Sequence, residues 1–261
     1  MVLFDYSREP RSDIAFVDMK SFYASCECIA LGLDPLKTSL CVVSRIENSA
    51  GLILAATPLF KKNFGSQNVS RSYNLPFDAH TRKFNYTAAR KQGLPITADY
   101  VRFIEDAAQK TLLVPPRMNY YIQKNMEIQK IFQDFAAPDD IFPYSIDEGF
   151  LDLTSSINYF IPDQTLDRRT KLDLLAARIQ QAIWKKTGIY ASIGLSNANP
   201  LLAKLALDIE AKHTKKMRVN WSYEDVPSKV WTIPTITDFW GIGHRTATRL
   251  KKLGIHSIYD L

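Results

Sequence analysis

The sequence has few cysteines and no long hydrophobic run. Its three cysteines cannot all pair, and its four histidines lie far from them along the chain, so we expect neither a disulfide framework nor a zinc site. The longest apolar stretch, residues 51–60, is about half the length of a membrane-spanning helix. The first residues carry no basic segment followed by an apolar one, as a secretory signal would. These absences predict a cytoplasmic protein with no membrane partner.

The composition is that of a folded globular chain. Of 261 residues, 46% are hydrophobic and 23% are charged, which excludes a disordered or fibrous protein and leaves room for one large domain or two to three small ones. Ten glycines and thirteen prolines are ordinary usage, and no segment repeats at a fixed period. A solenoid or propeller is therefore not expected.

The formal charge of +6 is distributed unevenly. Residues 56–110 hold nine Lys or Arg against four acids, and residues 204–261 hold ten against six. Residues 131–167 reverse this balance, with eight acids and no Lys or Arg. An acidic centre between basic flanks suits a protein that holds cations in the middle and a phosphate backbone on either side. An acidic loop that simply faces water is the alternative.

Hydrophobic periodicity predicts strands and helices in an order that suggests a sheet. Residues 14–18 form an apolar run that would place Asp18 at a strand tip. Asp147 and Glu148 would occupy the turn of a hairpin whose strands are residues 141–146 and 150–154. The other expected elements are helices over residues 21–30, 118–135, 172–183 and 200–212, strands over 40–44, 51–56 and 190–195, a helix begun by Thr57-Pro58, and loops with short helices over 65–117. This order matches a split βαβ sheet with helices on one face.

Three carboxylates would meet if the strand of Asp18 lies beside the hairpin of Asp147 and Glu148. Like charges this close repel unless cations neutralise them, and Mg²⁺ prefers such oxygen ligands. Two Mg²⁺ ions would clamp an in-line phosphoryl transfer. The alternative is that Asp147-Glu148-Gly149 is only a favourable turn.

Two multi-residue signatures point to one family. Residues 14–27 read Ile-Ala-Phe-Val-Asp-Met-Lys-Ser-Phe-Tyr-Ala-Ser-Cys-Glu, and residues 144–152 read Tyr-Ser-Ile-Asp-Glu-Gly-Phe-Leu-Asp. Together they resemble the paired signature of the Y-family (translesion) DNA polymerases of the UmuC type. The resemblance implies an α+β right-hand fold with a split βαβ (ferredoxin-like) palm, small fingers and a helical thumb. It also implies that Asp18, Asp147, Glu148 and the carbonyl of Met19 hold two Mg²⁺ ions, with the three acids catalytic.

The resemblance also implies residues that bind the incoming dNTP. Tyr23 would lie under the sugar and exclude a 2′-hydroxyl, next to Phe22, although both rings could instead be core packing. Lys62 stands where many members carry Arg, and Lys204 belongs to an Ala-Lys pair that meets the triphosphate. Leu59 departs from the family, because many members have a phosphate-bonding Tyr there. The alternative for the lysines is an exposed helix face.

The C-terminal segment resembles a helix-hairpin-helix. Its glycines would let the backbone approach a phosphate of primer-template DNA, and neighbouring basic side chains would neutralise that phosphate without reading sequence. The expected DNA-binding residues are Gly241, Gly243, Arg245, Arg249 and Lys251.

The resulting prediction is an error-prone lesion-bypass DNA polymerase. We expect palm over residues 1–25 and 112–213, fingers over 26–111 and thumb over 214–261. The family's C-terminal little-finger domain is not part of this sequence, and a sliding clamp or accessory subunits would be recruited through such an absent region. The alternatives are a catalytically silent DNA-binding relative, which predicts a broken carboxylate set, and a nucleotide cyclase, which does not call for a basic thumb.

Overall fold

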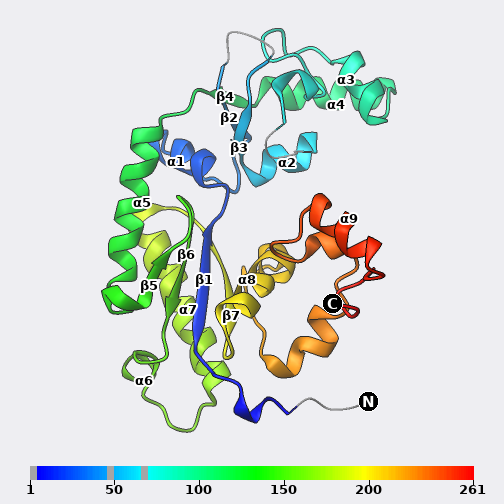
Figure 1. Ribbon diagram of the computed structural model, residues 1–261. Coiled ribbons are helices and arrows are strands. Elements are labelled where there is room, and N and C mark those ends of the chain that lie inside the picture. Colours follow the sequence, from blue (N-terminus) through cyan, green and yellow to red (C-terminus); the bar gives the residue numbers. More distant parts are fainter. Residues whose placement is uncertain (1–4, 46–49, 66–69) are drawn as a thin grey trace. The chain divides into compact units, whose positions relative to one another are not determined.

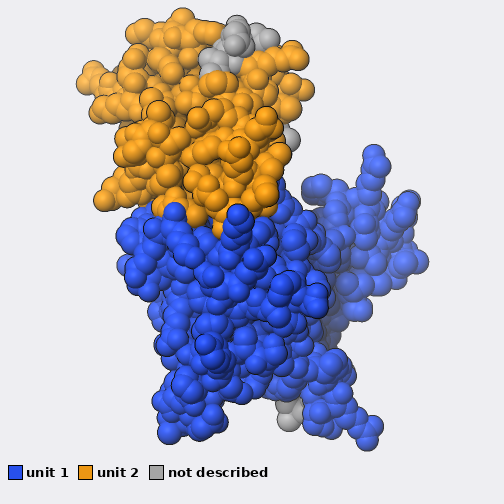
Figure 2. Space-filling model, turned by 90° about the vertical axis from the view of Figure 1, so that its left-hand side faces the viewer, with its two compact units in different colours: residues 1–19, 128–186, 190–261 blue, residues 20–127, 187–189 orange. Residues whose placement is uncertain are grey.

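The computed structural model describes residues 5–45, 50–65 and 70–261. They divide into two compact units, unit 1 with residues 1–19, 128–186 and 190–261, and unit 2 with residues 20–127 and 187–189 (Figure 2). The assignment of residue ranges to palm, fingers and thumb stays a prediction. No helix among the described residues is long and apolar enough to cross a membrane.

Unit 1 is built on a five-stranded sheet with the order β5-β6-β1-β7-β8 (Figure 1). The strands are β1 (Ile14–Met19), β5 (Ile141–Pro143), β6 (Glu148–Asp152), β7 (Ala191–Ser196) and β8 (Arg218–Asn220). β1 is antiparallel to both β6 and β7, whereas β7 and β8 are parallel. The prediction that the first strand lies beside the acidic hairpin is therefore confirmed.

The hairpin differs from the prediction at its turn. We expected both Asp147 and Glu148 in the turn, but Glu148 is the first residue of β6 and only Asp147 precedes the strand. The first strand of the hairpin ends at Pro143 rather than at residue 146, and the amides of Tyr144 and Ser145 both donate to the carbonyl of Glu148, so the turn spans residues 144–147 instead of 147–149. Glu148 is thereby held in the sheet.

Four helices belong wholly or mostly to unit 1. They are α6 (Ile157–Phe160), α7 (Arg168–Thr187), α8 (Pro200–Leu205) and α9 (His244–Lys252). Asn199 caps α8 by accepting from the amide of Leu202, and Pro200 occupies its first turn. The expected helix over 200–212 is not regular, because α8 continues as a π-helical turn (Ala206–Glu210) and a 3₁₀ turn (Ala211–His213).

The helical segment from α8 onward packs directly on the sheet. Ala203, Leu207 and Ala211 lie one helical turn apart and pack against Ile14 and Phe16 of β1. Gly194 of β7 makes this approach possible, since a Cβ there would lie 2.0 Å from the carbonyl oxygen of Ala203. The segment is thus fixed over one end and one face of the sheet.

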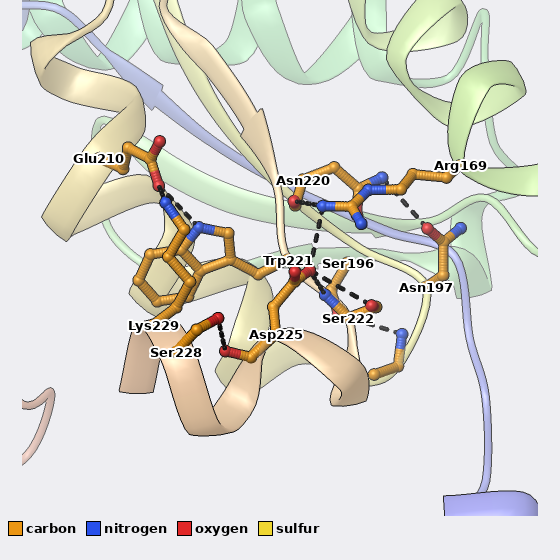
Figure 3. Close-up of polar contacts among 11 residues, drawn as sticks. Arg169, Ser196, Asn197, Glu210, Asn220, Trp221, Ser222, Asp225, Ser228 and Lys229 are labelled. Carbon is orange, nitrogen blue, oxygen red and sulfur yellow. Dashed lines mark hydrogen bonds and ion pairs between the residues drawn. The ribbon is translucent and has the colours of Figure 1, made fainter. Parts of the chain in front are cut away.

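Polar contacts attach the segment after β8 to the sheet and its helices (Figure 3). The indole of Trp221 donates to Glu210 at 2.9 Å, and Lys229 donates to the same carboxylate at 2.9 Å. Arg169 of α7 contacts the carbonyl of Asn220 and the carboxylate of Asp225. These contacts fix the base of the segment that leads to α9.

Unit 2 contains a three-stranded sheet with the order β3-β2-β4. Its core includes four packed aromatic rings, those of Phe60, Phe64, Phe77 and Phe84. The elements are α1 (Phe22–Ala30), β2 (Leu40–Val43), β3 (Ile53–Ala56), α2 (Pro58–Phe64), α3 (Tyr86–Gln92), α4 (Ala98–Gln109), β4 (Leu112–Val114) and most of α5 (Met118–Phe132).

Two predictions for this region need correction. Residues 65–117 contain more regular structure than loops and short helices, because α4 is a 12-residue helix and β4 pairs in parallel with β2. The helix expected over 118–135 ends at Phe132, and Met118 is exposed rather than on its buried face. Met118 lies at the helix start, where only one side of the turn is covered.

Candidate active site

Asp18 and Glu148 lie directly opposite each other on β1 and β6. Side chains alternate along a strand, so Asp18 projects from the same face as Ile14 and Phe16, the face that the α8 segment covers. The residue opposite in register shares that face, which brings Glu148 beside Asp18. The two carboxyl groups interact directly enough that each shifts the pKa of the other. Of the three predicted acids, Asp18 and Glu148 are therefore the two that the neighbouring strands bring into contact.

Two lysines from the α8 segment neutralise this pair. The Nζ of Lys204 is 2.8 Å from Oε1 of Glu148, and the Nζ of Lys212 is 3.0 Å from Oδ2 of Asp18 and 3.6 Å from Oε1 of Glu148. Asp208 lies between the lysines in sequence and pairs with both, at 3.1 Å and 3.0 Å. The result is a compact cluster of three carboxylates and two ammonium groups.

The local environment shifts the pKa values of the cluster. Burial raises the pKa of Asp18 to about 7, and the hydrogen bond to Glu148 acts in the same direction, whereas Lys212 opposes both. Burial also acts to raise the pKa of Glu148, but hydrogen bonds from Asp18 and Lys204 outweigh it and the net pKa lies below the ordinary value. Asp18 is therefore the more readily protonated of the two acids, and Glu148 the more readily ionised.

Asp147 and Met19 are the neighbours of Glu148 and Asp18 along the chain. The carboxylate of Asp147 does not join those of Asp18 and Glu148 in a group of three. The amide of Met19 donates to the carbonyl of Asp147 at 2.9 Å, which ties the end of β1 to the hairpin. The carboxylate of Asp147 accepts from Oγ of Ser145 at 2.9 Å. Within the part of the chain that the structure describes, no three His, Cys, Asp or Glu side chains form a group that could hold a metal ion.

Sequence reasoning missed Lys212 and Asp208. Lys204, Asp208 and Lys212 are spaced by four, which places them on one helical face, as the ion pairs at both i,i+4 steps bear out. This spacing was the available signal. The alternative of an exposed helix face is wrong for Lys204, which is only 6% exposed. Its ammonium group also lies 5.0 Å from the centre of the Phe16 ring.

The expected nucleotide-binding residues of unit 2 lie in different environments. Phe22 is the first residue of α1, and its ring is buried, with 2% of the residue exposed. Tyr23 is half-buried, with one ring face stacked on Tyr121. Lys62 is exposed in the last turn of α2, and Leu59 on the same helix is half-buried. Their roles stay predictions.

The expected DNA-binding residues lie along α9 and in the turn before it, with Arg249 and Lys251 in the last turn of the helix. Gly241 has a φ of +85°, a left-handed conformation that favours glycine, and Gly243 is the N-cap of the helix. Arg245, Arg249 and Lys251 are exposed on α9. The element before the glycines is only a 3₁₀ turn, Ile236–Asp238, so the first helix of the expected helix-hairpin-helix is short.

Comparison with known sequences identifies the relatives of the chain. The impB/mucB/samB family profile matches residues 81–208, and the profile of the IMS family HHH motif matches residues 223–255. UvrX of Bacillus subtilis strain 168, named provisionally as a UV-damage repair protein, is 34% identical over 259 residues, which are 99% of this chain and 51% of UvrX. DNA polymerase IV 2 of the same organism is 30% identical over 250 residues, 95% of this chain and 50% of the polymerase.

A solved structure confirms the fold class. The insertion ternary complex of Dbh DNA polymerase aligns with 94% of this chain and 58% of its own, with a TM-score of 0.63 and 24% identity. At this identity the likeness concerns the fold, which is the α+β polymerase fold expected from the sequence signatures.

A shorter relative is matched almost completely. The DNA repair protein homolog YozK of Bacillus subtilis strain 168 is 34% identical over 143 residues, 55% of this chain and 98% of YozK. The chain spans about half the length of the longer curated relatives it matches. Both family profiles, the shared fold and the near-complete match to YozK lead to one conclusion: the chain belongs to the impB/mucB/samB family, the UmuC-type Y-family of its two sequence signatures.

Proposed function

We propose that this chain is the core of a template-directed DNA polymerase of the lesion-bypass class, which adds deoxynucleotides to a primer 3′ end. The observation that carries the proposal is the pairing of Asp18 and Glu148 at one end of the central strands. Two acids forced together by sheet register in a partly buried place are unfavourable for stability. Such an arrangement is typical of sites that bind cations for catalysis.

The oxygen donors proposed for the cations are the Asp18–Glu148 pair and two groups next to it along the chain, and the Asp147 carboxylate, which accepts from Ser145 in this structure, would have to turn toward the pair. The carboxylates of Asp18, Asp147 and Glu148 and the carbonyl of Met19 would hold two Mg²⁺ ions, which favour oxygen ligands and leave positions for phosphate. When bound, the ions would polarise the phosphoryl group and stabilise the attacking and leaving oxygens. Asp18 would be favoured in its ionised form when cations are bound, because their positive charge would stabilise both carboxylates.

The two lysines provide the complementary charge for the nucleotide. Lys204 and Lys212 hold their ammonium groups within 4 Å of the acidic pair. Once cations neutralise the acids, these ammonium groups are available to the triphosphate, whose oxygens replace the carboxylates as their partners. Lys62 would add a point charge without the forked geometry that Arg offers. We assign Tyr23 the role of excluding the ribose 2′-hydroxyl.

DNA binding would rest on phosphate contacts. The exposed Arg245 lies in the first turn of α9, where the helix amides favour an anion, and the exposed Arg249 and Lys251 lie in the last turn. Such contacts hold a duplex without reading its sequence, as a polymerase requires.

A primer-extension assay tests the proposal. The chain is incubated with an end-labelled primer-template, single dNTPs and Mg²⁺, and DNA affinity is measured in parallel. We expect addition of the nucleotide complementary to the template and its loss on chelation of Mg²⁺. DNA binding without extension would identify a silent relative. Conversion of ATP alone to pyrophosphate and a cyclic product would identify a cyclase, and either outcome would refute the proposal.

A further inference from the structure

The ring of Tyr23 is stacked on a second, fully buried tyrosine of unit 2. The ring centroids of Tyr23 on α1 and Tyr121 on α5 are 4.4 Å apart, and the planes differ by only 14°. Tyr121 is 0% exposed, whereas Tyr23 is half-buried. Tyr121 is therefore the fixed partner on one face of the Tyr23 ring, which also packs against the buried cluster that includes Leu40 and Val42.

Tyr121 is itself held by a buried carboxylate. Its hydroxyl donates to Oε1 of Glu27 at 2.7 Å, and Glu27 is only 5% exposed. Arg117 donates to both oxygens of the same carboxylate, from Nε at 3.0 Å and from a terminal guanidinium nitrogen at 2.7 Å. A buried carboxylate with three donors has little freedom to move, because a shift breaks a hydrogen bond to a buried charged group, although the Arg117 side chain itself is half exposed.

The four residues form one connected unit between two helices. Tyr23 and Glu27 are four residues apart and share a face of α1, and Arg117 and Tyr121 are four residues apart at the start of α5. The stack and the hydrogen bonds run in series from Arg117 through Glu27 and Tyr121 to Tyr23. Nothing in this chain of contacts uses the carboxylates of the candidate active site.

We propose that Tyr121, clamped by Glu27 and Arg117, is a positioning residue that sets the sugar selectivity of the polymerase through Tyr23. This inference rests on the proposed role of Tyr23 as the group that excludes the 2′-hydroxyl. Exclusion by contact depends on the ring position to about 0.5 Å, because a ring that can retreat by that distance admits the extra oxygen. Tyr121 covers one face of the Tyr23 ring, so a sugar on the opposite face could not displace the ring toward Tyr121.

The test compares incorporation of ribonucleotides and deoxynucleotides by matched variants. Tyr121→Leu removes the ring behind Tyr23, and we expect the ratio of ribonucleotide to deoxynucleotide kcat/KM to rise about tenfold, less than for Tyr23→Ala. Tyr121→Phe keeps the stack and should restore the ratio to within about threefold of wild type. Arg117→Met leaves Tyr121 in place but loosens Glu27, and should give a rise of several-fold. It also serves if Tyr121→Leu does not fold.

Phe77→Leu is the control, because Phe77 is an equally buried ring of unit 2 that packs on Phe64. It should lower the melting temperature about as much as Tyr121→Leu and leave the ratio unchanged. The ring-proton chemical shifts of Tyr23 should move in Tyr121→Leu and not in Phe77→Leu, a readout that needs no activity.

Three results would overturn the proposal, and they are distinguishable. If Tyr23→Ala raises the ratio but Tyr121→Leu and Arg117→Met do not, Tyr121 is only a core residue. If Tyr23→Ala leaves the ratio unchanged, Tyr23 is not the excluding group and the positioning role fails with it, while primer extension by the wild-type chain would still stand. Unmoved Tyr23 shifts in Tyr121→Leu would also refute it.

Discussion

At the scale of single residues, the candidate active site is a set of charges that compensate one another. Asp18 and Glu148 are brought together by strand register. Lys204 and Lys212 neutralise the negative charge that bound cations would otherwise neutralise. The side chain of Lys204 is 7% exposed and that of Glu148 is 14% exposed. An ion pair this buried contributes little net stability, but the loss of one partner leaves an unpaired charge.

Lys204→Met should therefore destabilise the metal-free protein by about 3 kcal/mol, because Glu148 loses its nearest counter-charge. Combining it with Glu148→Gln should recover about half of that loss, since the remaining side chain is neutral. Urea unfolding of both variants and of Glu148→Gln alone, in the presence of a chelator, measures the coupling. Strictly additive losses would mean that the two side chains do not interact.

Tyr23 excludes ribonucleotides by contact if the proposed function is right. Tyr23→Ala should then raise ribonucleotide incorporation by about a hundredfold or more and change deoxynucleotide incorporation much less, because specificity by a clash disappears with the ring. Tyr23→Phe should keep most of the exclusion. Single-nucleotide incorporation assays and a melting curve separate this from ordinary packing, for which both substrates would be affected equally.

At the scale of elements, the site depends on how closely the α8 segment approaches β7. Gly194→Ala would place a Cβ 2.0 Å from the carbonyl of Ala203 and 2.4 Å from the amide nitrogen of Leu207. Backbone atoms cannot yield as a flexible side chain can, so the helix must move away from the sheet. Lys204, which follows Ala203, would move with it.

We expect Gly194→Ala to cost about 3 kcal/mol of unfolding free energy and to lower polymerase activity in the fraction that remains folded. Gly243→Ala is the stability control, because a Cβ there meets no atom within 4 Å and the backbone is extended. It should change stability by less than about 0.5 kcal/mol. Thermal unfolding of the two variants provides the comparison, and equal melting temperatures would contradict the close packing.

The elements that sequence reasoning found are those with strong local signals. The apolar run of β1 and the cap and proline of α8 could be recognised without tertiary information. β4 and β8 are three-residue strands, which are too short for an alternating or apolar pattern to be distinguished from chance. They are strands because β2 and β7 offer them parallel partners, which is a tertiary effect.

The same distinction applies to the site. The pairing of Asp18 with the acidic hairpin followed from one topological assumption, that their strands are neighbours. The contact of Lys212 with Asp18 depends on the π-helical turn Ala206–Glu210, which sets the position of the residues that follow it. No local sequence pattern predicts that turn. Periodicity alone could place Lys212 on the face of Lys204 but not at the carboxylates.

At the scale of the whole molecule, the charge distribution predicts how the chain binds DNA. Ten basic residues against six acids in residues 204–261 include the exposed Arg245, Arg249 and Lys251 of α9. Phosphate contacts release counterions, so the logarithm of the affinity should fall linearly with the logarithm of the salt concentration and depend little on sequence.

Arg249→Gln should reduce the slope of that plot by about one, the value for a single phosphate contact. Lys185→Gln is the matched control, because Lys185 is an exposed cation on α7 and its replacement changes the net charge equally. Fluorescence anisotropy with a labelled primer-template over a series of salt concentrations gives both slopes. A flat plot for the wild-type chain would show that the basic segments are not a DNA footprint.

The central claim is that the Asp18–Glu148 pair is the catalytic centre of a polymerase, and the rate of single-nucleotide incorporation by Asp18→Asn tests it most directly. Asp152→Asn is the control, since Asp152 lies on the same strand as Glu148 and pairs in register with Ile14 at the far end of β1. In Mg²⁺, Asp18→Asn should lower the rate at least about a hundredfold with DNA affinity within about threefold of wild type, and Asp152→Asn should change neither. A rate for Asp18→Asn above about a tenth of wild type would contradict the account.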